Sequence, residues 1–246
     1  MGKRISFIFL ILLAISTQAQ WSVGGRTGFN MCKITGTLSS NYDTRNFWIF
    51  GPAGYGMGNY QLNDIFSIRG ELGYTIMGTE AINIYTEGNY SYSYGIMERY
   101  NCAQVIFAGQ ATYNTRILSG YLFIGPYLTH RFGGRGLYYD VETTEELDIV
   151  WVEGYSYYIY DGKLRIGELN NRRYDFGLYA GAGIGKELGK GRIDLGLSFG
   201  AGLVDLHKFV NPDHRKSARQ NGYKSFHNLN LNVTLSYWFH IRKDVE

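Results

Sequence analysis

Apolar and polar residues alternate along most of this 246-residue chain. In the clearest run, residues 229–239, apolar side chains at odd positions are separated by mostly polar residues at even positions. A period of two places alternate side chains on opposite faces of a β-strand, and a run of this length exceeds the usual strand of a soluble protein. The same pattern, clear or weaker, predicts eight strands in all: 21–31, 47–62, 66–76, 100–113, 121–132, 176–184, 193–201 and 229–239.

The connections between these strands alternate between short and long. Asn63-Asp64, residues 114–120 and residues 187–191 form the short ones. The other four connections are long, and they are residues 33–46, 77–99, 133–173 and 204–226. Outer-membrane barrels have this arrangement, with short turns at the periplasmic end and long loops outside the cell. The pattern therefore predicts an up-and-down barrel with both termini at the short-turn end.

Alternation alone leaves open which face of each strand points inward. A soluble lipocalin-like barrel turns its apolar face toward a ligand, whereas a membrane barrel turns it toward lipid. Lipid is favoured because the opposite face is rich in glycine, charged and amide side chains, and because the long tyrosine-rich connections lie at one end only. Aromatic residues near the ends of the apolar faces also fit the interfacial girdles of membrane barrels: Trp21, Phe29, Phe66, Phe132, Phe176, Tyr237 and Phe239.

The sequence thus predicts an all-β fold, an eight-stranded antiparallel up-and-down transmembrane β-barrel with short periplasmic turns and long extracellular loops, in the bacterial outer membrane. The ring must close because an open sheet edge cannot exist in hydrocarbon. We expect a monomer that contacts outer-membrane lipid. In the last strand, outward residues are predicted to be Leu229, Leu231, Val233, Leu235 and Tyr237, and inward residues Asn230, Asn232, Thr234 and Ser236.

The N-terminus has the pattern of a secretory signal peptide. Lys3 and Arg4 precede an apolar run over residues 5–15, and the small residues Thr17 and Ala19 fit a cleavage site after Ala19. An N-terminal membrane anchor is the alternative, but the apolar run is short compared with the roughly 20 residues that a helix needs to span a bilayer. We therefore expect a signal peptide over residues 1–19 and one barrel domain over residues 20–246.

Several segments resemble the PorT-like outer-membrane β-barrel family. They are residues 62–74 with Gly78 after them, residues 175–183, residues 200–206 and the final run 229–239. The resemblance covers essentially the whole mature chain. It implies an outer-membrane barrel without agreed catalytic residues, and one member of the family is linked to a secretion and gliding apparatus. An accessory role beside such an apparatus is what the resemblance implies here.

Composition excludes several other classes of function. The net charge is only +3, with acids and bases mixed along the chain, so a nucleic-acid partner is not expected. Cys32 and Cys102 are the only cysteines and cannot form a four-ligand zinc site by themselves. We predict no cofactor, no metal and no catalytic role for either cysteine. A disulfide between them is left open, because their strands are not neighbours in the predicted ring.

Catalytic motifs are weak in this sequence. The segment 181–186 resembles a phosphate-binding loop, but Glu187 stands where serine or threonine should follow the lysine, so glycines facing the lumen are the better interpretation. Histidines lie near strand ends or in loops, at His130, His207, His214, His227 and His240. We expect no Ser–His–acid set at one rim, and therefore a non-enzymatic protein. A barrel enzyme acting on outer-membrane lipid is a less favoured alternative.

Charged residues of inward parity predict a polar cluster in the lumen. Arg26 and Glu71 lie at similar heights when counted from the short-turn end, and Arg69 shares their inward parity. Strand 47–62 lies between them, and its glycines at positions 51, 54, 56 and 58 would leave room for an arginine to reach across. A buried carboxylate requires a partner, so we predict an Arg26–Glu71–Arg69 cluster that plugs the barrel, with Gln104 or Gln110 beside it.

The long connections are the candidate binding surface. Residues 148–160 and 163–166 flank Asp161-Gly162, a hairpin signal, and four tyrosines fall in this loop: Tyr155, Tyr157, Tyr158 and Tyr160. They either bind a partner or pack the loop on itself. The fourth connection is basic, through Lys208, His214, Arg215, Lys216, Arg219 and Lys224, and either contacts lipopolysaccharide or is simply solvated. We predict a structural or binding barrel, with other envelope proteins as further candidate partners, and a small pore as the alternative.

Overall fold

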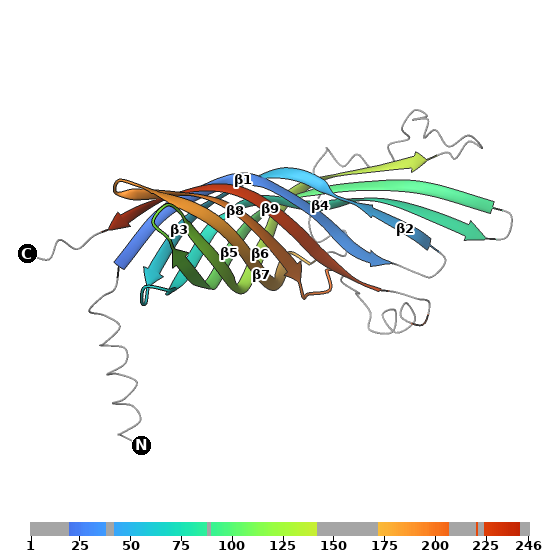
Figure 1. Ribbon diagram of the computed structural model, residues 1–246. Helices are drawn as coiled ribbons and strands as arrows, with labels where there is room; N and C mark the ends of the chain where they lie inside the picture. Colours follow the sequence, from blue (N-terminus) through green and yellow to red (C-terminus); the bar gives the residue numbers. More distant parts are fainter. Residues whose placement is uncertain are drawn as a thin grey trace, which may run out of the picture.

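The chain forms one β-barrel in a computed structural model that describes residues 20–37, 42–87, 90–141, 172–206, 220 and 224–241 (Figure 1). Within these residues no helix is long and apolar enough to cross a membrane. Nine strands follow one another along the chain: β1 (Gln20–Thr37), β2 (Tyr42–Phe47), β3 (Ile49–Gln61), β4 (Phe66–Glu87), β5 (Tyr90–Asn114), β6 (Ser119–Val141), β7 (Tyr174–Leu188), β8 (Gly191–Gly202) and β9 (Lys224–Ile241).

Eight of these strands close into a ring. β1 pairs with β3 on one side and with β9 on the other, and β3 to β9 each pair with the next strand along the chain. Every pairing is antiparallel, and Trp21 at the start of β1 lies opposite Ile241 at the end of β9. β2 pairs only with β4, above the ring. The predicted eight-stranded antiparallel barrel is therefore confirmed, with one short additional strand.

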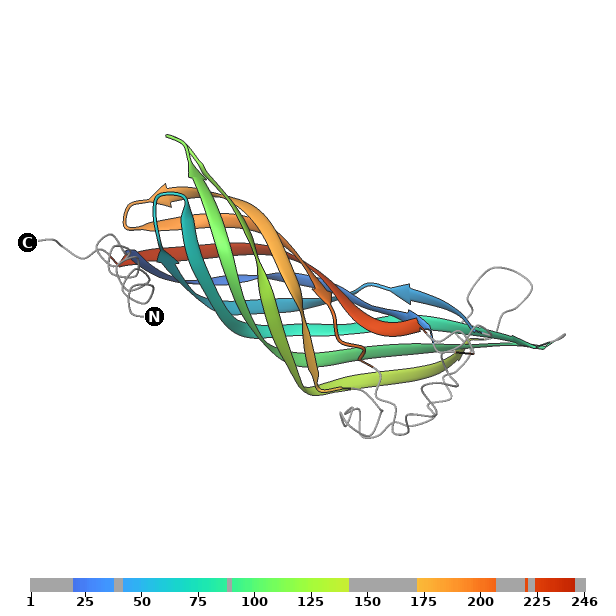
Figure 2. The same ribbon diagram turned by 90° about the horizontal axis from the view of Figure 1, so that it is seen from below.

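The three short connections lie at the same end as the two chain ends of the ring (Figures 1 and 2). Asn63 shapes the first, because its side-chain oxygen accepts hydrogen bonds from the backbone N–H groups of Ile65 and Phe66 at 2.9 and 2.7 Å. Thr115 closes the second by donating to the carbonyl of Leu118 at 2.6 Å. Gly189 supplies a positive φ of 62° in the third. In outer-membrane barrels this end faces the periplasm.

The apolar faces of the strands point outward. In β9, Val233 and Leu235 are 46% and 54% exposed, while Asn232 and Thr234 between them are buried in the lumen. The outward row and the inward row have the predicted parity throughout this strand. A closed ring whose outer surface is apolar and whose interior is polar is built to be surrounded by lipid. The structure therefore excludes the lipocalin-like arrangement.

Several strands continue well beyond their predicted ends. Residues 77–99 were predicted as a loop, but they form a hairpin in which the pairing of β4 with β5 runs from Met77–Tyr100 to Glu87–Tyr90. β6 likewise continues to Val141 and pairs with β5 there. The prediction was wrong because alternation of apolar residues is required only where one face of a strand meets lipid. Above that band the backbone ladder continues without it.

The extended strands build a sheet that projects from the ring. β2, β4, β5 and β6 reach beyond the other strands at the end away from both termini (Figure 1). β2 forms one edge of this sheet, and β7 pairs with β6 only over Ser119–His130. Among the described strands, the outer edge of β6 beyond Gly133 therefore has no partner. The predicted signal peptide over residues 1–19 and the whole tyrosine-rich segment 148–166 lie outside the described residues.

Candidate functional site

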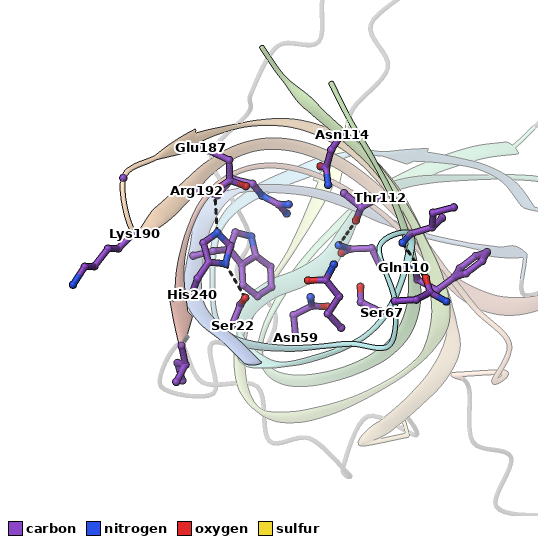
Figure 3. Close-up of a pocket in the computed structure, with 17 residues that line it drawn as sticks. Ser22, Asn59, Ser67, Gln110, Thr112, Asn114, Glu187, Lys190, Arg192 and His240 are labelled. Atoms are coloured by element: carbon purple, nitrogen blue, oxygen red, sulfur yellow. Dashed lines mark hydrogen bonds and ion pairs between the residues drawn. The ribbon is translucent and has the colours of Figure 1, made fainter. Parts of the chain in front are cut away.

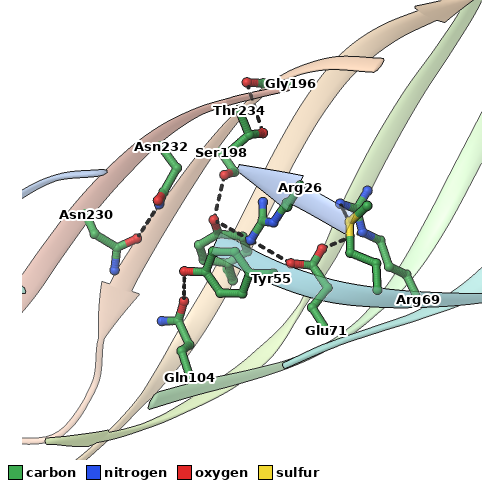
Figure 4. Close-up of polar contacts among 12 residues, drawn as sticks. Arg26, Tyr55, Arg69, Glu71, Gln104, Gly196, Ser198, Asn230, Asn232 and Thr234 are labelled. Atoms are coloured by element: carbon green, nitrogen blue, oxygen red, sulfur yellow. Dashed lines mark hydrogen bonds and ion pairs between the residues drawn. The ribbon is translucent and has the colours of Figure 1, made fainter. Parts of the chain in front are cut away.

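The lumen holds a buried cluster of charged side chains (Figure 4). Arg26 on β1 approaches one oxygen of Glu71 on β4 at 2.6 Å, and Arg69 approaches the other at 2.5 Å. The side chains of all three are 0–1% exposed. Glu71 therefore bridges two guanidinium groups, and the structure brings together the three residues that were predicted to meet. Each partner lowers the cost of burying the others.

Aromatic rings complete this cluster from both sides. The guanidinium of Arg26 lies 4.1 Å from the ring centre of Tyr55 and donates a hydrogen bond to the hydroxyl of Tyr179 on β7 at 3.3 Å. Arg69 lies 4.7 Å from the ring centre of Phe123 and donates to Gln110 at 3.2 Å. Of the two glutamines considered, Gln110 thus contacts Arg69 directly. Gln104 is joined to the cluster through Tyr55, whose hydroxyl donates to it at 2.8 Å.

The expected role of the β3 glycines is wrong. Gly54, Gly56 and Gly58 alternate with the buried residues of β3, so they do not face the lumen between the charges. Gly51 is buried, but a Cβ atom there would meet the side chain of Ile76 and not an arginine. The inward positions there belong to Tyr55 and Met57, which fill the space beside the two arginines. Room is made instead by Gly73 on β4, where a Cβ atom would lie 2.4 Å from the ring of Tyr55. The inward positions of strand 47–62 were assigned wrongly because its glycines obscure the alternation of apolar and polar residues.

Two further sets of polar side chains form contacts inside the lumen between residues of the same or nearby strands. Toward the short-turn end, Asp194 pairs with Arg192 at 2.7 Å and accepts a hydrogen bond from the indole of Trp238 at 2.8 Å. Toward the other end, Asp175 accepts from Tyr127 at 2.9 Å and from Asn228 at 2.8 Å. The barrel is therefore occupied by side chains at successive heights, as expected for a ring of this size.

The cysteines are buried and unbridged. Cys32 accepts a hydrogen bond from the backbone N–H of Gly78 at 2.9 Å, and Cys102 lies in the same apolar cluster. Glycines of β7 also serve packing, since Cβ atoms at Gly181 and Gly183 would collide with the rings of Phe123 and Tyr121. The described residues contain no group of three or more His, Cys, Asp or Glu side chains that could hold a metal ion.

A polar cavity of about 700 Å³ opens at the short-turn end of the ring (Figure 3). Its floor includes Gln110, which links the cavity to the buried Arg69. Amide and hydroxyl side chains line one side, and Glu187, Lys190, Arg192 and His240 line the other. The remaining polar lining residues are Ser22, Asn59, Gln61, Asn63, Ser67, Thr112 and Asn114.

Three lining residues form a hydrogen-bonded chain. The Oγ atom of Ser22 lies 3.0 Å from Nδ1 of His240, and Nε2 of the same ring lies 3.0 Å from a carboxylate oxygen of Glu187. Ser22 is buried, whereas His240 and Glu187 are 31% and 54% exposed at their side chains. The prediction that no Ser–His–acid set meets at one rim is therefore wrong. Ser22 and His240 are 218 residues apart and become neighbours only when β9 closes the ring against β1.

The candidate binding residues in the loops are not placed. Tyr155, Tyr157, Tyr158 and Tyr160 lie outside the described residues. Of the basic residues of the fourth connection, only Lys224 is described, at the start of β9. Sequence reasoning named His240 among the histidines near strand ends, but it did not connect this residue with Ser22 or Glu187. Their only signal was inward parity or a position next to a short turn.

Three proteins of known structure are similar to the chain at low sequence identity. Ail of Yersinia pestis has a TM-score of 0.40 and 11% identity, over 89% of this chain and 98% of Ail. OprG of Pseudomonas aeruginosa has a TM-score of 0.44 and 9% identity, over 92% and 97%. Neisserial surface protein A has a TM-score of 0.38 and 11% identity, over 90% and 97%.

A family model gives the stronger result. None of the curated protein sequences matches the chain. The model for the outer membrane protein beta-barrel domain, however, matches residues 16–208, which is more than half of the sequence. Together with the closed ring and its apolar outer surface, this match places the protein in the bacterial outer membrane. The chain belongs to the outer membrane protein beta-barrel domain family.

Proposed function

We propose that this protein is a sealed outer-membrane barrel that binds a partner at its extracellular end. One observation carries the proposal: the lumen is crossed by buried ion pairs, while four strands continue outside the ring as a projecting sheet. The side chains in the lumen thus stabilise the fold, and the projecting sheet presents additional surface outside the ring to which a partner can bind. A partner that docks there gains a rigid platform at little further cost in conformational entropy.

The lumen cluster argues against a pore. Conduction past Arg26 and Glu71 would require their contact to open, and breaking a buried ion pair by removing one partner costs about 3–5 kcal/mol. The hydrogen bond from Arg26 to Tyr179 also joins β1 to β7 across the ring. These contacts bind the walls of the barrel together at its centre. We therefore expect no steady ion current through the folded protein.

The partner is expected to belong to the bacterial envelope. The tyrosines of residues 155–160 follow β6 in the chain and supply the aromatic side chains that binding surfaces favour. The basic residues before β9 are suited to lipopolysaccharide headgroups through charge attraction. The resemblance to PorT-like barrels favours a protein partner within a secretion or gliding apparatus. A barrel of this kind would act as a monomeric accessory.

The projecting hairpin can be removed without altering the membrane ring. Replacing residues 82–95 by Asn-Gly leaves Ala81 opposite Ile96 and closes them with a two-residue turn. The variant also removes most of the residues with which β2 pairs. A matched control places Asn-Gly at Arg116-Ile117, in a turn at the opposite end.

We expect envelope proteins that co-purify with the parent barrel to be lost from the hairpin variant and kept by the turn control. In planar bilayers the parent should be silent. Equal recovery of partners from both variants would contradict a binding role for the projecting sheet. Stepwise currents from the parent would favour the pore instead.

A further inference from the structure

We propose that the barrel also hydrolyses carboxylic esters at its periplasmic mouth, with Ser22 as nucleophile and His240 as general base. The substrate class is a short-chain ester of a hydroxyl-rich carrier, such as an acetylated sugar. This activity goes beyond the binding role proposed for the extracellular end. It rests on the hydrogen-bonded chain from Ser22 through His240 to Glu187 and on the cavity into which these residues open.

The contacts have the distances that such chemistry requires. A serine hydroxyl becomes nucleophilic when an adjacent base lies within about 2.6–3.2 Å and a third group orients that base. Both contacts of His240 measure 3.0 Å. A neutral imidazole donates from one nitrogen and accepts at the other. With Nε2–H donating to Glu187, Nδ1 is left to accept the proton of Ser22.

The strand register supplies a candidate oxyanion donor. Ser22 lies directly between Asn59 on β3 and His240 on β9, because it is paired with both. Side chains opposite each other in neighbouring strands have Cβ atoms about 4.5–5.5 Å apart. The Asn59 side chain lines the cavity, and its amide nitrogen carries N–H groups that can donate to an oxyanion. Because the backbone near Ser22 is paired on both sides, a side-chain amide must stabilise the oxyanion here.

The cavity indicates the kind of substrate. Ser67, Gln110, Thr112 and Asn114 line the wall opposite His240, where they can hydrogen-bond to hydroxyl groups (Figure 3). A cavity of about 700 Å³ lies in the usual range for small ligands. A long acyl chain would not bind well here, because it would cover these polar side chains without offering them hydrogen bonds. Arg69 blocks the lumen below Gln110, so substrate and products exchange with the periplasm.

The reaction balances with water as the only co-substrate. Ser22 Oγ attacks the carbonyl carbon while its proton moves to Nδ1 of His240. The bond from the carbonyl carbon to the carrier oxygen breaks, and the carrier leaves as an alcohol with that proton. Water then attacks the acyl-serine, gives one proton to His240, and releases the carboxylic acid as Oγ regains the proton. The ester is thus converted to an alcohol and an acid.

The test uses the full mature barrel, purified from outer membranes in detergent. A fluorophosphonate probe is followed by peptide mass spectrometry, and rates are measured with p-nitrophenyl acetate, an acetylated xylan and phosphatidylethanolamine vesicles. We expect an adduct on Ser22, hydrolysis of both acetyl esters and no hydrolysis of the phospholipid. Ser22→Ala should lose the adduct and the rate above background. Asn59→Ala should lower the rate about 100-fold while leaving the fold intact.

Ser236→Ala is the matched control, because Ser236 lies on β9 outside the cavity lining and its buried hydroxyl has no hydrogen-bond partner. It should keep the parent rate. Unboiled gel mobility verifies that each variant still forms a barrel. An absent Ser22 adduct, or equal rates for Ser22→Ala and the parent, would overturn the proposal and reduce the three contacts to a structural link between β1 and β9. Hydrolysis of the phospholipid alone would overturn the proposed substrate class.

Discussion

The strands inside the ring and their continuations above it follow different rules. Within the ring, every other side chain meets lipid, and the side chains between them meet a closed polar lumen. Above the ring, β4 and β5 remain paired for ten further residue pairs beyond Met77–Tyr100 without that alternation. The backbone ladder is thus continuous through two environments, and only the membrane imposes the pattern. Mutations in the two regions should therefore have very different costs.

The largest expected effect is at the lumen cluster. Glu71→Ala leaves the guanidinium groups of Arg26 and Arg69 buried without their shared carboxylate, and should lower the free energy of unfolding by about 3–5 kcal/mol. Asp43→Ala in β2 is the control, since the side chains of Asp43 and Arg45 are both 66% exposed and such pairs contribute about 0–1 kcal/mol. Urea unfolding in lipid vesicles measures both. Similar losses would mean that the two regions do not differ.

A charged side chain on the outer face should have the next largest effect. Val233→Arg, or Leu197→Arg opposite it on β8, places a cation in lipid and should cost about 2–4 kcal/mol near the bilayer midplane. Phe47→Arg in the projecting β2 should cost at most about 1 kcal/mol, the value typical of positions near or beyond the interface. The same vesicle unfolding assay compares them. A near-neutral Val233→Arg would contradict the lipid-facing assignment of β9.

Packing inside the ring should have a smaller effect. Gly73→Ala would place a Cβ atom 2.2 Å from the carbonyl oxygen of Gly54 and 2.4 Å from the ring of Tyr55, so we expect a loss of about 1–3 kcal/mol. Gly70→Ala, on the same strand, meets nothing within 4 Å and should be close to neutral. Thermal unfolding of the two variants in one detergent gives the comparison. Equal melting temperatures would show that both the Gly54 backbone and the Tyr55 ring can shift to make room for the Cβ atom.

The smallest effect on stability is expected at the mouth cavity. Ser22→Ala removes one hydrogen bond to a histidine whose side chain is 31% exposed, and such bonds contribute about 0.5–1.5 kcal/mol. The loss should fall at the low end of that range, because water can replace the serine. Urea unfolding measures this loss beside Ser236→Ala, which removes no side-chain hydrogen bond. A loss as large as that of Glu71→Ala would identify Ser22 as a structural residue.

The sequence could predict contacts in the candidate sites where the position of a residue along its strand could be counted from a nearby short turn. Counting residues from the short turns put Arg26 and Glu71 at similar heights, and the structure pairs them. The counting worked because β3 connects to β4 through a turn of four residues, which ties height to sequence position. Tyr55 and Met57 were missed between them because the glycines of β3 weaken the alternation that reveals parity.

The sequence by itself determined the ring of eight strands, the end that holds the short turns, and the faces that meet lipid. These features follow from a period of two, which most of the strands carry locally and which the glycines of β3 weaken. Only the tertiary structure decided which residues meet where the ring closes. The register of β1 against β9 places Ser22 beside His240, 218 residues away in the chain. The pairing of β7 with β8 and of β8 with β9 places Glu187 beside the imidazole of His240. No local pattern encodes a register between the first and last strands, because it results from closing the whole barrel.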